Sequence, residues 1–115
     1  MSPARLAAAA ALLLGAWDSL WYGVLFPTTA VAPPLGALLL AGPILLCIPN
    51  VGRGAPLALG CAGFLSIGYL AHGLTELVAN PAERTAAGVA TGLAALLMLL
   101  TIHALRVQRR APRQD

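Results

Sequence analysis

The chain has 115 residues, too few for more than one domain, and its composition excludes an ordinary soluble one. Apolar residues make up 59% of the chain and charged residues 10%, against roughly 45–50% and about 25% in soluble domains. The net charge is +3, and all seven basic residues are arginines. Because so small a soluble domain has too little interior for this much apolar surface, we predict one domain, residues 1–115, embedded in lipid.

The first apolar segment covers residues 6–26, after Arg5 and before Pro27. As a helix it spans roughly 30 Å, the thickness of a bilayer core. A basic start and a run of alanines are also typical of a secretory signal peptide. However, Leu14-Gly15-Ala16 is a poor cleavage site, and the apolar run continues beyond it. We therefore expect this segment to be retained as a transmembrane helix.

The second apolar segment covers residues 32–48 and ends before Pro49-Asn50. A helix of this length reaches about 25 Å, which is short but sufficient with little tilt. Gly42-Pro43 lies inside it and predicts a kink, because proline removes one backbone hydrogen bond. The carbonyl group that this frees must find a partner within the protein, since lipid offers none.

Two further apolar segments, residues 56–78 and 85–105, are separated by Asn80-Pro81-Ala82-Glu83-Arg84. Pro56 suits the first turn of a helix. The connections between the four segments are short, as is usual between antiparallel neighbours in a bundle. The sequence thus predicts an all-α protein, a bundle of four transmembrane helices.

Arginine placement predicts the orientation of this bundle. Basic residues stand before the first segment, between the second and third, and after the fourth, at Arg5, Arg53, Arg106, Arg109, Arg110 and Arg113. The first connection has no charge, and Glu83 cancels Arg84. The positive-inside rule then places both termini in the cytoplasm. Arginine without lysine, with much Ala, Gly and Pro, is typical of GC-rich bacteria, so we expect the bacterial inner membrane.

The arginine-rich tail also suggests binding to nucleic acid or acidic lipid, but cytoplasmic retention explains it more simply, and we expect no nucleic-acid partner. At the opposite, outer end of the first segment, Trp17, Trp21 and Tyr22 form a group where an aromatic belt belongs. The aromatic and charge signals therefore predict the same orientation.

Ionisable residues within the segments are the sharpest functional signal, because burying them in hydrocarbon is costly. Asp18 lies about two turns from the outer end of the first segment. His72 and Glu76 are spaced i, i+4 near the outer end of the third, and Tyr69 extends their face. These four side chains form the candidate intramembrane polar cluster. It is either a clasp between the first and third helices or a pocket for a proton, a cation or a divalent metal, and spacing does not separate these.

The remaining candidates favour structural roles. His103 lies near the cytoplasmic end of the last segment, where it suits a helix C-terminus. Cys47 and Cys61 are too few for a disulfide framework and are interpreted as small packing residues. No recognisable nucleophile and base, HExxH or CxxC motif is present, so we expect no enzyme activity, no resident metal and no cofactor.

Small residues at helical spacing predict close helix packing. Gly88 and Gly92 form a G-x-x-x-G motif, and Ala8, Ala11 and Gly15 give the first segment a small face. Such motifs serve packing within a bundle more often than dimerisation.

Four motifs together resemble a known family of small bacterial inner-membrane proteins, domain-of-unknown-function family 2069. They are Trp17-Asp18-Ser19-Leu20-Trp21, Gly-Pro-Ile-Leu-Leu at 42–46 before Gly52-Arg53-Gly54, Tyr69-Leu70-Ala71-His72-Gly73 with Glu76, and Asn80-Pro81-Ala82-Glu83-Arg84. The resemblance covers residues 12–110 and implies a four-span inner-membrane protein without an established activity.

The function expected from the sequence is that of a non-enzymatic structural or accessory membrane subunit. Its expected partners are the lipid bilayer and other membrane subunits or a second copy. The alternative is a small proton- or cation-coupled transporter that uses Asp18 or Glu76. Small multidrug transporters have a similar length and span count, but the arginine bias of this chain is stronger than their dual orientation allows.

Overall fold

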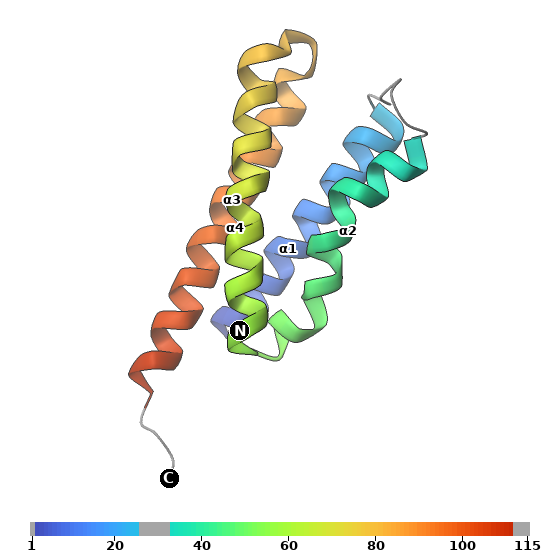
Figure 1. Ribbon diagram of the computed structural model, residues 1–115. Helices are drawn as coiled ribbons and strands as arrows, with labels where there is room; N and C mark the ends of the chain where they lie inside the picture. The colour runs from blue at the N-terminus through green and yellow to red at the C-terminus, as the bar shows by residue number, and fades with distance from the viewer. Residues whose placement is uncertain (1, 26–32, 112–115) are drawn as a thin grey trace.

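The computed structural model describes residues 2–25 and 33–111, and this part of the chain is entirely helical (Figure 1). The elements in chain order are α1 (Pro3–Leu20), the π-helical turn η1 (Trp21–Leu25), α2 (Pro33–Gly52), α3 (Pro56–Ala79), the short 3-10 turn η2 (Pro81–Glu83) and α4 (Arg84–Arg110). The prediction of an all-α protein is confirmed for these residues. The uncharged first connection and Arg113 lie outside the described residues.

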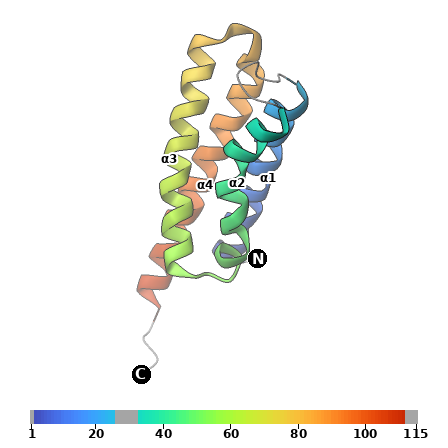
Figure 2. The same cartoon turned by 45° about the vertical axis from the view of Figure 1, so that its right-hand side comes forward.

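The helices form two antiparallel hairpins, α1 with α2 and α3 with α4, which lie side by side (Figures 1 and 2). Helix α1 also packs along α4, whereas α2 touches α3 much less. Helices α1 and α3 therefore lie diagonally across the bundle. The molecule is elongated, with extents of 55 × 24 × 20 Å.

Helix boundaries follow local chemistry. Ser2 caps α1 by accepting a hydrogen bond from the Arg5 amide at 3.2 Å, and Pro3 follows as the first residue of the helix. Pro56 begins α3 in the same way. Helix α4 ends at Arg110, and its last turn is basic, which complements the helix dipole.

The second helix is longer than predicted. It was expected to end at residue 48, but it continues through Pro49 to Gly52, and Pro43 also lies inside it. A proline removes only its own hydrogen bond, so later amides still find partners. The Arg53 amide donates to the Pro49 carbonyl at 3.2 Å. The chain leaves the helix at Gly54, whose φ of 76° is favourable only for glycine.

Small residues bring the helices together, as predicted for α1. Ala11 and Gly15 are buried, and a Cβ atom on Gly15 would come 2.8 Å from Leu45 Cγ of α2. In the other hairpin, a Cβ atom on Gly73 would lie 3.2 Å from the backbone nitrogen of Thr91. At Gly73 the helix axes therefore approach too closely to admit a larger side chain, whereas at Gly15 the Leu45 side chain would have to move.

The G-x-x-x-G motif of α4 does not make such a contact. Gly92 is exposed, and a Cβ atom there would meet nothing within 4 Å. Gly88 is also exposed and has only Leu77 Cδ1 nearby, at 3.9 Å. The expectation that this motif packs within the bundle was wrong, because α4 turns its opposite face, which carries Ala87, Ala90 and Ala94, inward.

One end of the molecule collects the basic residues. There the Gln108 amide donates to the Gly54 carbonyl at 2.5 Å, and a Cβ atom on Gly54 would lie 3.7 Å from Ala4 Cβ. The start of α1, the α2–α3 turn and the end of α4 therefore meet. We call this the basic end, defined by its arginines Arg5, Arg53, Arg106, Arg109 and Arg110.

Two helical stretches of the described chain are long and apolar enough to cross a membrane, Pro56–Ala79 and Pro81–Arg110. In their most apolar windows only 22% and 33% of the residues are buried, whereas a core helix of a soluble protein is mostly buried. Large apolar side chains instead face outward, among them Leu57 at 81% exposure and Val78 at 78%. A bilayer is the solvent that accommodates such a surface.

Replacing Gly73 with leucine tests the close approach of α3 and α4. Gly73→Leu should lower the free energy of unfolding by about 1–3 kcal/mol, because the Thr91 backbone cannot yield space without moving a helix. Unfolding of the purified protein in mild detergent, followed by circular dichroism, measures this. Gly92→Leu is the matched control and should cost nothing. Equal stability of both variants would contradict the packing described above.

Candidate functional site

The polar contacts between the two hairpins gather at the end opposite the basic end. Three side chains from the last turn of α1 and from η1 hydrogen bond across to the second hairpin: Trp17 Nε1 to the Ala86 carbonyl at 2.9 Å, Trp21 Nε1 to Glu83 Oε1 at 2.9 Å, and Tyr22 Oη with His72 Nε2 at 2.6 Å. We call Trp17, Trp21, Tyr22, His72 and Glu83 the aromatic clasp.

The local helix geometry directs these three side chains toward the second hairpin. Trp17 and Trp21 are four residues apart, so they share one face of α1, and this face points to α4. A π-helical turn begins at Trp21 and widens the last turn of the helix. Tyr22 is thereby placed against His72, which comes from the diagonal helix α3.

The rings of the clasp also pack on one another. The Trp21 ring centroid lies 4.7 Å from that of Tyr22 and 5.7 Å from that of His72, and the rings are tilted. Such separations are favourable for aromatic pairs. Trp21 is completely buried, and its neighbours in this small core are the alanines of α4, Ala86, Ala87 and Ala90. The prediction of an aromatic belt was therefore wrong for Trp21, which faces protein and not the membrane interface.

Glu83 connects the clasp to the α3–α4 turn. One of its carboxylate oxygens accepts from Trp21, and the other accepts from the Asn80 amide, which also donates to Glu76 Oε2 at 3.2 Å. Arg84 donates from Nε to the Leu77 carbonyl at 3.1 Å and so closes the turn. Sequence reasoning treated Glu83 only as a partner for the charge of Arg84. The available signal was the indole N–H of Trp21, because a buried indole needs an acceptor.

Asp18 is the exceptional group of the site. Its side chain is 1% exposed, and neither carboxylate oxygen has a hydrogen-bond partner among the described residues. The other two buried polar side chains, Ser66 and Thr101, donate to carbonyl groups of their own helices. Asp18 is close enough to Tyr22 and Tyr69 for its charge to act on both phenols. A buried carboxyl group without hydrogen bonds is costly, so its presence asks for a functional explanation.

The structure distributes the four residues of the predicted polar cluster among different surroundings. His72 pairs with Tyr22, and Glu76 accepts from Asn80 at the turn. Tyr69 lies in the main apolar core, and Asp18 is buried near it. Contacts between the hairpins are therefore made mainly by residues outside that cluster, because α1 lies beside α4 and not beside α3.

The other candidates lie elsewhere. His103 is exposed on α4, and Cys61 is exposed on α3. The half-buried thiol of Cys47 contacts the Pro43 carbonyl at 3.3 Å. Within residues 2–25 and 33–111, no three His, Cys, Asp or Glu side chains come together as metal ligands would.

A family model described as "Predicted membrane protein (DUF2069)" matches residues 6–109. The chain belongs to this family. The resemblance found from the sequence motifs is thereby confirmed. The match to DUF2069 includes every residue of the aromatic clasp as well as Asp18. Neither the curated proteins nor the solved structures contain a match to the chain. The description of DUF2069 specifies a membrane protein and no activity.

The Tyr22–His72 hydrogen bond can be measured by a double-mutant cycle in this DUF2069 protein. Tyr22→Phe and His72→Phe each remove one partner, and their coupling energy should be about 0.6 kcal/mol and no more than about 2, as for other intramembrane hydrogen bonds. Unfolding in detergent gives the four free energies. The control cycle combines Tyr22→Phe with Glu76→Gln, which accepts from Asn80 instead, and its coupling should be smaller. Equal coupling energies in the two cycles would mean that the Tyr22–His72 hydrogen bond makes no specific contribution to stability.

Proposed function

We propose that this DUF2069 protein is a four-span protein of the bacterial inner membrane that acts as a structural or accessory subunit and has no catalytic activity. The observation that carries the proposal is the contrast between its interior and its surface. The interior is packed mainly by alanine and leucine, whereas the outward faces of α3 and α4 carry large apolar side chains along most of their length. Such a surface serves contact with lipid and with other membrane helices.

Helix lengths support four spans. Helices α3 and α4 are each long and apolar enough. Helix α1 has 18 residues and η1 adds 5, which together reach about 35 Å, and the 20 residues of α2 reach about 30 Å. Each therefore matches the roughly 30 Å of a bilayer core.

Orientation follows from the basic end. Five described arginines are located there, while the α3–α4 turn at the other end carries one acidic and one basic residue, Glu83 and Arg84. The positive-inside rule places the basic end, and with it both chain termini, in the cytoplasm.

A topology assay tests this arrangement. A reporter enzyme that is active only in the periplasm should be inactive when fused after Asp115, because the basic end stays in the cytoplasm. The same reporter inserted after Ala82, in the α3–α4 turn, should be active. Activity after Asp115 would overturn the four-span arrangement with cytoplasmic termini.

One observation favours a second function, transport coupled to a proton or cation. Asp18 is a buried carboxyl group without a hydrogen-bond partner in the described residues, and such intramembrane acids often lie on ion pathways. Glu76 is a weaker candidate, because it is only half-buried and its carboxylate is engaged by Asn80.

Neutral substitutions separate the two functions. For an accessory subunit, Asp18→Asn should leave complementation of a deletion strain intact, since no hydrogen bond of the described residues is lost. For a transporter, Asp18→Asn should abolish complementation at normal membrane abundance, and Asp18→Glu should restore part of it because a titratable carboxyl returns. Glu76→Gln is the control and should complement in both cases. Loss of complementation by Asp18→Asn alone would reject the accessory function.

A further inference from the structure

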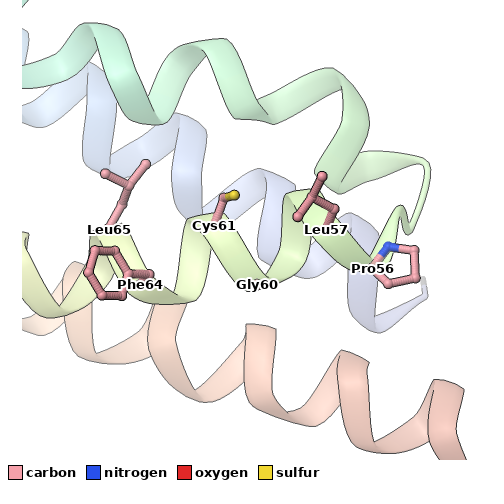
Figure 3. Close-up of a pocket in the computed structure, with 6 residues that line it drawn as sticks. All are labelled: Pro56, Leu57, Gly60, Cys61, Phe64 and Leu65. Atoms are coloured by element: carbon pink, nitrogen blue, oxygen red, sulfur yellow. The ribbon is translucent and has the colours of Figure 1, made fainter.

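Two adjoining hollows lie along the first turns of α3 at the basic end. The first is an open hollow of about 470 Å³ lined by Pro56, Leu57, Gly60, Cys61, Phe64 and Leu65 (Figure 3). The second is also open, has a volume of about 530 Å³ and is lined by Pro56, Gly60, Leu105, Gln108, Arg109 and Ala111. Because Pro56 and Gly60 line both, the two hollows form one continuous groove.

The groove is open where a glycine lacks a side chain. A Cβ atom on Gly60 would meet nothing within 4 Å, so the missing side chain leaves open space at its centre. All the residues that line the first hollow belong to α3, and Leu57, Cys61 and Leu65 occupy the side of this helix turned toward α2 (Figure 3). The lining of this part of the groove is apolar and lies far from the polar aromatic clasp.

The apolar part of the groove has the length of one membrane leaflet. From Pro56 to Leu65 the helix rises about 14 Å, close to half of the roughly 30 Å hydrocarbon core. A lipid acyl chain suits such a groove, since it is apolar, extended and already present in the leaflet. A water-soluble ligand would have to cross the headgroup region to reach it.

The other part of the groove has the chemistry of a headgroup site. Arg109 is exposed and has no acidic partner among the described residues. The neighbouring Gln108 is held by the Gly54 carbonyl, which fixes the last turn of α4 beside the α2–α3 turn. The described acidic residues, Asp18, Glu76 and Glu83, belong to the opposite half of the molecule. Arginine binds phosphate oxygens in bidentate fashion, so an anionic group is favoured here.

We propose that this groove binds an anionic phospholipid, with an acyl chain along α3 between Pro56 and Leu65 and its phosphate at Arg109. The proposal rests on the membrane-spanning arrangement proposed above, but not on the function of Asp18. Basic pockets at the ends of transmembrane helices are known to hold acidic headgroups. A second copy of the chain is a poorer occupant, because a parallel pair joined at this groove would place two basic ends side by side.

Lipid titration of the purified full-length protein tests the proposal. After removal of lipid in mild detergent, binding of phosphatidylglycerol and of phosphatidylcholine with the same acyl chains is measured by native mass spectrometry. Phosphatidylglycerol should bind more tightly. Arg109→Gln should weaken phosphatidylglycerol binding about fivefold, the effect of about 1 kcal/mol for one arginine near the surface, and should leave phosphatidylcholine unchanged. Gly60→Leu should weaken both lipids, because its side chain occupies the groove.

Matched controls separate a site from general attraction. Arg110→Gln makes the same charge change one residue further on, outside the groove lining, and Gly92→Leu fills an equally open glycine of α4. Both should bind lipid as the unmodified protein does. Equal weakening by Arg110→Gln, no preference for phosphatidylglycerol, or full binding by Gly60→Leu would each overturn the proposal. These outcomes are independent of the reporter fusions, which test the spanning arrangement without any bound lipid.

Discussion

Close packing of small side chains is the constraint on which this structure depends. In a bilayer the outside of a helix is as apolar as its neighbour, so burial alone gives helices little reason to associate. Here Gly15 admits Leu45 within the first hairpin, and Gly73 admits Thr91 within the second. Between the hairpins, α1 and α4 meet through alanines such as Ala11, Ala87 and Ala94. The helices come close enough for dispersion forces to hold them.

The two ends of the bundle differ in the contacts that accompany this packing. At one end the aromatic clasp adds hydrogen bonds from Trp17, Trp21 and Tyr22 across the hairpins. At the basic end a short turn joins α2 to α3, and the space at Gly60 remains open. One end is thus closed by protein contacts, whereas the other offers a groove to lipid.

Asp18 is the exception at the closed end of the bundle. It is buried beside the clasp but takes no part in its hydrogen bonds within the described residues. The energetic cost of such a carboxyl is easily avoided by asparagine or serine, so stability alone does not account for it. This makes Asp18, rather than His72 or Glu76, the residue on which the choice between an accessory protein and a transporter depends.

The sequence by itself determined the helical class, the membrane environment, the family and the charge asymmetry of the ends, because each follows from local composition and order. The tertiary structure alone decided which helices are neighbours. Helical periodicity places Trp21 and Glu83 on their own helix and turn but says nothing about the distance between them. The same limit explains why Asp18 was expected in one polar cluster with His72, and why Gly92 was expected inside the bundle. Contacts between distant segments depend on the relative rotation of whole helices, which no single segment encodes.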